Sequence, residues 1–222
     1  MKKISLYWNV SLILFFVMMG CTVTDDIYRE PLWPDIDLSL YRQYEVNWDN
    51  LKPSEEIDYW ELRPISDHSA ILKAGDKCKN ATNRETCIAE FDALRTDSGF
   101  GEICYLRFSC IRYVVTNQGG NNRLWDTLEE LKSFLGTIDS KEEAILLAEG
   151  DGFFISCAIS GHPSCFPGGI REIDGEYEMI VQKQISFCGP HQMNRYLIRI
   201  DTSTGLRVLR EQISHRNDKT TC

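Results

Sequence analysis

The sequence lacks any block of lysine and arginine residues. Its 24 basic residues are outnumbered by 33 acidic ones, and the formal net charge is −9. Proteins that bind nucleic acid neutralise phosphates with clustered positive charge, so nucleic acid is not expected among the partners. The same acidity argues against direct adhesion to anionic lipid.

Familiar catalytic motifs are also missing. The chain has no Gly-x-Ser-x-Gly, no His-Glu-x-x-His and no calcium-binding loop, and no lysine-serine or lysine-threonine pair follows Gly119-Gly120 as in a phosphate loop. Adjacent helical residues point apart, so Glu129-Glu130 and Glu142-Glu143 are interpreted as solvated helix starts and not as a glycosidase pair. These absences favour a non-enzymatic protein without a cofactor.

The first residues have the pattern of an export signal. Lys2 and Lys3 precede a mostly apolar run from Leu6 to Gly20, which is short for a membrane-spanning helix of about 20 residues. The run ends in Met18-Met19-Gly20-Cys21, with a small residue directly before a cysteine. This ending resembles the signal of bacterial lipoproteins, although leucine is usual in place of Met18. The resemblance implies that residues 1–20 are removed and that Cys21 is acylated, as by palmitate.

The lipoprotein resemblance also implies a location. In enteric-type bacteria, a residue such as Thr22 instead of aspartate after the cysteine implies sorting to the outer membrane. We therefore expect an exported protein of the bacterial cell envelope that faces the periplasm and contacts the membrane through its acyl chains alone. The alternatives are a secreted protein and a protein held by an uncleaved anchor.

Eight cysteines remain when Cys21 is set aside, and an even number in an exported chain indicates disulfides. Eight cysteines allow 105 connectivities, so the sequence does not fix the pairing. The simplest local pair is Cys78–Cys87, and the candidates as a whole are Cys78, Cys87, Cys104, Cys110, Cys157, Cys165, Cys188 and Cys222.

Geometry limits the pairing of Cys104 with Cys110. A straight strand over these residues would separate its ends by about 20 Å, whereas a disulfide needs Cα atoms within about 7 Å. Either residues 105–109 form a loop, which we favour, or the two cysteines pair elsewhere. For the remaining four we predict Cys157–Cys188 and Cys165–Cys222.

Two short segments have residue types that bind zinc. His162-Pro163-Ser164-Cys165 and Cys188-Gly189-Pro190-His191 are mirror images that together offer two imidazoles and two thiolates. Thiols outside the cytosol usually oxidise, so disulfides are favoured. The alternative function is a zinc protein or small periplasmic hydrolase built on His162, Cys165, Cys188 and His191. His68 and His215 lie in polar stretches and are interpreted as surface residues.

Residues 127–150 predict two capped helices in succession. Thr127 with Glu130 and Ser140 with Glu143 form capping boxes, and the helices end at Gly136 and Gly150. We expect the pair to cover one face of a sheet. A further helix is predicted over residues 82–94, with a capping box at its start from Thr82 and Glu85 and with Cys87 on its buried side.

Alternating apolar and polar residues predict strands after residue 110, over 111–116, 153–159, 177–181, 195–200 and 206–212, with a short return strand at 123–125. Residues 117–122 form a turn by composition, and Gly205 is expected to supply a positive φ in the last hairpin. Residues 76–215 are therefore predicted to form an α+β domain: an antiparallel sheet of about 4–6 strands, covered by short helices and stapled by disulfides.

Residues 21–75 are predicted to be an acidic, aromatic extension, and residues 216–222 a polar tail. The first part of the extension, from Thr22 to Pro34, is interpreted as a tether. Tyr41, Trp48 and Trp60 are expected to pack on the domain, with a sugar- or peptide-binding role as the alternative.

Residues 138–144, followed by strands and by residues 196–201 with Gly205-Leu206, resemble the PepSY module over about 75 residues. The long loop around Cys165 departs from that pattern. The resemblance implies binding or restraint of a peptidase, and the domain is also similar to uncharacterised bacterial lipoproteins. The expected function is thus a binding module with an envelope protein as partner.

Overall fold

The computed structural model describes residues 32–42, 46–54, 56–102, 111–154, 168–186 and 189–218. Within them, the helices are α1 (Arg84–Ala93), α2 (Leu128–Leu135) and α3 (Lys141–Gly150), with short 3-10 helices η1 (Leu38–Leu40) and η2 (Trp48–Asn50). The strands are β1 (Tyr59–Pro64), β2 (Leu72–Gly75), β3 (Arg112–Gln118), β4 (Asn121–Trp125), β5 (Gly169–Ile173), β6 (Glu176–Ser186), β7 (His191–Ile200) and β8 (Leu206–Asn217). No helix in these ranges is both long enough and apolar enough to cross a membrane.

The strands form two antiparallel sheets of four strands each, ordered β2-β1-β3-β4 and β5-β6-β7-β8. The α+β class is confirmed, but the expectation of one sheet with 4–6 strands is wrong. No strand is expected from the sequence before residue 111, yet β1 lies inside the first sheet, between β2 and β3. Its charged residues, Glu61 and Arg63, are buried and bridged to each other, so the alternation in β1 does not separate core from solvent.

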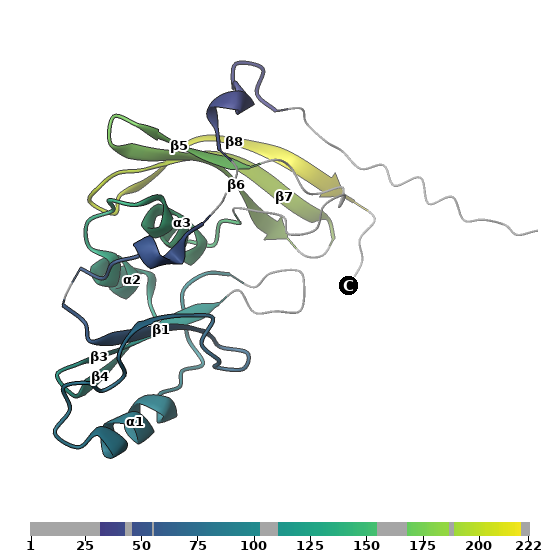
Figure 1. Ribbon diagram of the computed structural model, residues 1–222. Helices are drawn as coiled ribbons and strands as arrows, with labels where there is room; N and C mark the ends of the chain where they lie inside the picture. Colours follow the sequence, from purple (N-terminus) through teal and green to yellow (C-terminus); the bar gives the residue numbers. More distant parts are fainter. Residues whose placement is uncertain are drawn as a thin grey trace, which may run out of the picture.

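Helices α2 and α3 lie between the two sheets (Figure 1). The largest core cluster joins Leu62 of the first sheet, Leu131 and Ile145 of the helices, and Met179 of the second sheet. Both helices therefore bury apolar surface toward a sheet, and residues 144–148 of α3 are all buried. On the other side of the first sheet, Phe91 of α1 forms a second cluster.

The predicted capping boxes of α2 and α3 are confirmed, and Gly136 ends α2 with a φ of 67°. The predicted capping box at Thr82 and Glu85 is wrong. The N-cap of α1 is Asn83, whose side-chain oxygen accepts a hydrogen bond from the Thr86 N–H. Asparagine caps at least as well as threonine, which moves the start of the helix by one residue.

Two glycines have roles that differ from those predicted. Gly150 is the last helical residue of α3, and Gly152 takes the left-handed conformation with a φ of 84°. A Cβ on Gly150 would lie 2.4 Å from Leu131 Cδ2, so this glycine allows α2 and α3 to approach. In the last hairpin the positive φ belongs to Thr204 (66°), whereas Gly205 leaves room for the carboxylate of Asp201.

Most predicted strands are confirmed and are longer than expected. Strands β6, β7 and β8 contain the predicted segments, and β3 contains its segment except for Ile111. Strand β4 is the predicted return strand, and the turn predicted over residues 117–122 is confined to residues 119 and 120. Gly119 and Gly120, both with positive φ, form the two-residue turn between β3 and β4. Strand β5 was not expected. The predicted strand 153–159 lies largely outside the described residues, although Phe154 forms a bridge with Gln182.

The described residues before β1 form two segments, one on the outer face of the second sheet and one against the helices. We call residues 33–42 the outer strap and residues 46–54 the inner strap. The outer strap covers the outer face of the sheet, where Tyr41 is buried against Ile180 and Leu197. Its last residue, Arg42, exchanges two backbone hydrogen bonds with Ile170 of β5, with N–O distances of 3.0 and 3.1 Å. The outer strap therefore closes the β5 edge of the sheet.

The inner strap lies against the helical layer. Leu51 is buried in the main core and Trp48 packs against it, while the Ser54 N–H donates to the Phe134 carbonyl oxygen at 2.8 Å. Packing of Tyr41, Trp48 and Trp60 on the domain is confirmed, since Trp60 also lies in the main core.

Candidate functional site

The outer face of the second sheet carries a group of basic side chains, which we call the arginine face: Arg171, Arg195, Arg199, Arg207 and Arg210. Strand pairing places them together: Glu178 lies between Arg171 and Arg199, and Arg199 is opposite Arg207. Side chains alternate across a strand, so these partners share one face. A chain with a net charge of −9 thus has a locally basic surface.

Glu178 is at the centre of the arginine face, with a side chain only 3% exposed. One carboxylate oxygen accepts hydrogen bonds from the Tyr41 hydroxyl at 2.7 Å and from Arg171 Nε at 2.9 Å. The other accepts from Arg199 at 2.6 Å. Glu178 therefore joins the outer strap to β5 and β7 through charge-assisted hydrogen bonds.

Burial alone would raise the pKa of Glu178. Hydrogen bonds from Tyr41, Arg199 and Arg171 outweigh burial and hold this pKa below its ordinary value of 4.5. Burial and the hydrogen bond to Glu178 together raise the pKa of Tyr41 above its usual range. The pair therefore consists of a carboxylate acceptor and a phenol donor at neutral pH, which is a stable structural arrangement.

Ion pairs at the rim of the arginine face are more exposed. Arg207 contacts both carboxylate oxygens of Glu176 at 2.8 Å. Arg210 forms a two-point contact with Asp35 of the outer strap, at 2.7 and 2.5 Å. Besides its backbone hydrogen bonds to Ile170, the outer strap is thus held by one buried and one exposed side-chain contact.

Glu142 and Glu143 hold the inner strap, and their interpretation as solvated residues is wrong because each is only 1% exposed. Glu142 accepts from the Asn47 N–H at 2.9 Å, and Glu143 accepts from the Lys52 N–H at 3.1 Å. Burial raises the pKa of Glu143, opposed by backbone hydrogen bonds from Asp139 and Lys52. The two carboxylates are structural: they satisfy backbone donors of a crossing segment.

Replacing Glu143 by alanine is expected to lower the free energy of unfolding by about 1–3 kcal/mol, because it removes a cap and leaves buried donors without an acceptor. Glu130→Ala is the matched control, since Glu130 has the same capping-box position but does not contact the strap. Its expected cost is about 1 kcal/mol or less. Urea denaturation measures both, and equal losses would mean that the Lys52 contact contributes nothing.

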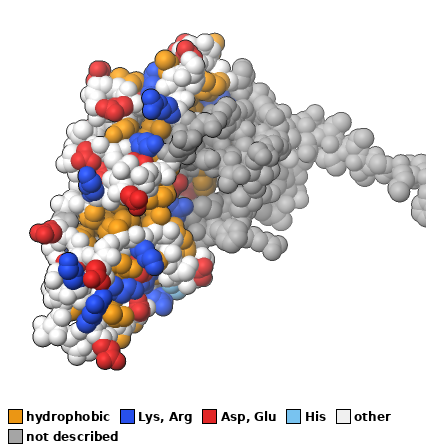
Figure 2. Space-filling view, in the orientation of Figure 1, with side chains coloured by type: hydrophobic (Ala, Val, Ile, Leu, Met, Phe, Trp, Pro, Cys, Tyr) orange, Lys and Arg blue, Asp and Glu red, His pale blue; other side chains and the backbone are white. Residues whose placement is uncertain are grey.

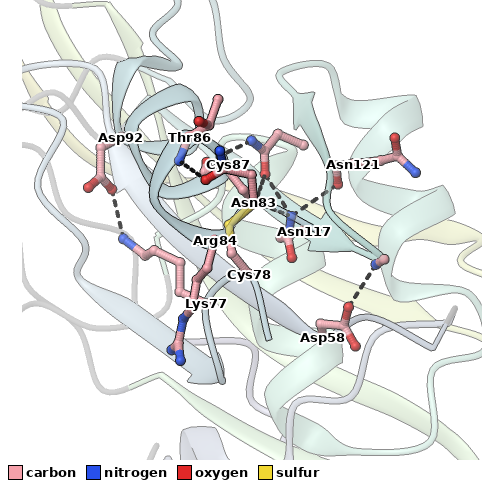
Figure 3. Close-up of a disulfide and its surroundings, with 12 residues drawn as sticks. Asp58, Lys77, Cys78, Asn83, Arg84, Thr86, Cys87, Asp92, Asn117 and Asn121 are labelled. Carbon is pink, nitrogen blue, oxygen red and sulfur yellow. Dashed lines mark hydrogen bonds and ion pairs between the residues drawn. A yellow bond between two sulfur atoms is a disulfide. The ribbon is translucent and has the colours of Figure 1, made fainter. Parts of the chain in front are cut away.

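The predicted disulfide between Cys78 and Cys87 is confirmed, with a Cα–Cα distance of 6.0 Å. Figure 3 shows how it ties the loop before α1 to the first turn of that helix. Asn117 of β3 donates to Cys87 Sγ at 3.3 Å and to the Asn122 side-chain oxygen at 2.8 Å. Asn122 in turn donates to the Cys87 carbonyl oxygen at 3.1 Å. The disulfide and two amides therefore fasten α1 to the β3–β4 hairpin.

The region of the disulfide also contains a buried ionic cluster. Glu61 accepts from the Tyr59 hydroxyl at 2.6 Å and from Arg63 Nε at 2.7 Å, and it pairs with Lys77 at 3.0 Å. Burial favours a higher pKa for Glu61, but these partners hold the pKa below its ordinary value. Each charge has an opposite partner, so the cluster stabilises the contact between the first sheet and α1.

The predicted histidine–cysteine set is only partly described. His162, Cys165 and Cys188 lie outside the described residues, as do Cys21, Cys104, Cys110, Cys157 and Cys222. His191 begins β7, where its ring lies 5.4 Å from that of His215. Among the described residues, no three histidine, cysteine or acidic side chains form a group suited to a metal ion.

The interpretation of His215 as a surface residue is wrong. It belongs to β8 and is 5% exposed, because the last strand extends beyond the predicted segment into sequence that resembles a polar tail. His68 does lie in a turn, half-buried, where its Nδ1 is 3.0 Å from the Tyr113 hydroxyl. The two histidines therefore have separate structural environments.

The arginine face was not predicted from the sequence. The available signal is that Arg195, Arg199 and Glu178 fall on the polar side of predicted strands. Their convergence depends on strand order and register, and the contribution of Tyr41 depends on a contact over 137 residues of chain. A pattern within one strand does not carry this information.

Comparison with known proteins gives no match: no family model, no curated protein and no solved structure matches this chain.

Proposed function

We propose that this chain is a lipid-anchored protein of the bacterial cell envelope, and that its α+β domain binds another envelope protein without catalysing a reaction. The signal-like residues ending at Cys21 support the anchor, and a buried disulfide is typical of an oxidising compartment. A role in restraining a peptidase is suggested only by the PepSY resemblance.

The observation that carries the proposal is the attachment of the N-terminal segment to the domain. Tyr41 and Asp35 bind Glu178 and Arg210, so the chain that follows the proposed lipid site leads onto the second sheet. This attachment shortens the connection between Cys21 and the domain to about a dozen residues, which keeps an anchored domain close to partners in the same membrane.

The Cys21→Ala variant is expected to lose fatty-acid labelling, because only this thiol follows the small residue of the signal. Cross-linking and pull-down from native membranes should recover a partner with the wild-type chain and much less with the variant. Continued fatty-acid labelling of Cys21→Ala would contradict the lipid anchor, whereas equal recovery of the partner would show that binding does not need the anchor.

The second candidate is a zinc protein or small hydrolase built on His162, Cys165, Cys188 and His191. The contact between His191 and His215 favours it, because it supplies a second imidazole beside His191. Stoichiometric zinc in protein purified without chelators, lost on His191→Ala, would select this candidate.

A further inference from the structure

Helix η1 and strand β8 form a surface that combines hydrophobic and basic side chains. Among the described residues, large hydrophobic side chains are exposed at six positions, and four of these lie in η1 and β8: Leu38, Leu40, Val208 and Leu209. The two-point contact between Asp35 and Arg210 holds β8 to the outer strap that contains η1. Val208 pairs with the core residue Ile198 and therefore lies on the other side of the sheet. We call Leu38, Leu40 and Leu209, with Arg207 and Arg210, the η1–β8 surface; Figure 1 shows η1 standing over the second sheet.

The surroundings of the η1–β8 surface have a positive balance. Five arginines of the arginine face lie with two carboxylates, Glu176 and Glu178, on the same side of the sheet. The outer strap adds Arg42, Asp35 and Asp37, and the β5–β6 turn adds Asp174 beside Arg199, so six arginines, of which Arg195 is buried, are set against five carboxylates. Figure 2, in the orientation of Figure 1, shows acidic and basic side chains interspersed over the face that it draws.

Two of these arginines reach solvent in spite of their ion pairs. The side chain of Arg207 is 54% exposed and that of Arg210 is 40% exposed. Exposed ion pairs of this kind contribute little to stability, so their charges remain available to a second anion. At physiological salt, screening limits charge–charge interactions to about 8–10 Å. The charges near the η1–β8 surface therefore determine which ions bind there, and the net charge of the whole chain has little influence.

The position of the surface in the chain points to the membrane. About a dozen residues separate Cys21 from Trp33, where the outer strap begins. Their fully extended length is about 40 Å. A lipid on Cys21 would therefore hold the η1–β8 surface close to the headgroups, at an effective concentration in the millimolar range. Even weak contacts are occupied at such a concentration.

We propose that the η1–β8 surface docks on anionic phospholipid headgroups as a second membrane contact beside the acyl chains. Arg207 and Arg210 meet the lipid phosphates, while Leu38 and Leu40 enter the interfacial region. This proposal rests on the proposed function, because the lipid anchor is what brings the η1–β8 surface close to a membrane. Combining a lipid chain with basic and apolar side chains gives a stronger attachment than either alone.

The test uses residues 22–222, the unacylated chain without the apolar run of residues 6–20, and pure phospholipid vesicles. It should co-sediment with vesicles containing phosphatidylglycerol and not with vesicles of phosphatidylcholine alone. Raising the salt concentration should weaken binding, because headgroup attraction is screened. Absence of binding to phosphatidylglycerol vesicles at low salt would overturn the proposal.

Matched variants locate the contact. Arg207→Glu should lower the vesicle partition coefficient about tenfold or more, since each basic residue near an anionic surface changes affinity severalfold. Arg84→Glu on α1 is the control: its side chain is 57% exposed and it pairs with one carboxylate at 2.8 Å. Likewise, Leu40→Glu should weaken binding and Ile71→Glu should not, although both side chains are about half exposed.

Equal decreases in the vesicle partition coefficient for Arg207→Glu and Arg84→Glu would overturn the proposal. They would show that vesicle binding depends on the net charge of the protein and not on the η1–β8 surface. A chain that ignores vesicles but needs Arg207 for cross-linking to a membrane protein would also overturn it, in favour of a protein partner. The assay contains only unacylated chain and lipid. Its failure therefore leaves the anchor and the envelope function intact, and these are tested separately by fatty-acid labelling and pull-down.

Discussion

Replacing Glu178 by glutamine is expected to lower the free energy of unfolding by about 2–4 kcal/mol, measured by urea denaturation. The substitution keeps the size of the side chain but leaves Arg171 and Arg199 without their buried anionic partner. Glutamine offers one acceptor oxygen where glutamate offers two, so its NH2 group faces either Arg199 or the Tyr41 and Arg171 donors. The expected decrease in the free energy of unfolding is smaller than for breaking a fully buried ion pair, because Arg171 and Arg199 are both partly exposed to water.

Glu176→Gln is the matched control, because Glu176 is on the same strand and pairs with Arg207 but is 28% exposed. Its expected cost is about 1 kcal/mol or less. The pKa of Glu178 is below 4.5 in the folded protein, so its stabilisation is complete above that pH and is lost as the pH falls through the lowered pKa. The stability curves of wild type and Glu178→Gln should converge in acid, and a constant difference at every pH would contradict the ionic role.

The Cys78→Ala/Cys87→Ala variant is expected to unfold with about 2–3 kcal/mol less free energy than the wild-type chain. The bond closes a short loop, with a sequence separation of 9, so its effect on the unfolded chain lies toward the lower end of the usual range. Thermal and urea unfolding under non-reducing conditions measure the loss. We expect α1 to be affected first, because the bond and Asn117 fasten it to the hairpin.

Peptide mapping of the non-reduced wild-type chain gives the independent check. It should recover the peptides of Cys78 and Cys87 joined to each other, in keeping with the bond in the structure. A peptide joining either cysteine to another one, or a double variant as stable as the wild type, would contradict this prediction.

Local signals predicted much of the fold. The capping boxes of α2 and α3, the Gly119-Gly120 turn and the alternation in β6 each depend on residues within a few positions of one another. The short Cys78–Cys87 loop is likewise a local feature. Such elements can be predicted because their stabilising contacts join residues that are close together in the sequence.

The division into two sheets and the arginine face were not predictable in the same way. Burial of Glu61 and Arg63 depends on α1 covering the first sheet, and burial of Glu142 and Glu143 depends on the inner strap. Charged residues usually face water, so a sequence pattern assigns them to the surface. Only tertiary contacts show that each has a partner inside the protein.

The outer strap also bears on the order in which the chain folds. Asp35 contacts Arg210 across 175 positions, and Tyr41 contacts Glu178 across 137. A chain synthesised from its N-terminus contains the outer strap long before β6 and β8 exist, and pairing over such distances comes late. The outer strap therefore docks only after β5, β6 and β7 have formed, and its attachment is complete only when β8 is present. A chain cut short within β8 before Arg210 would lack the Asp35 contact, so the last part of this attachment depends on completion of synthesis.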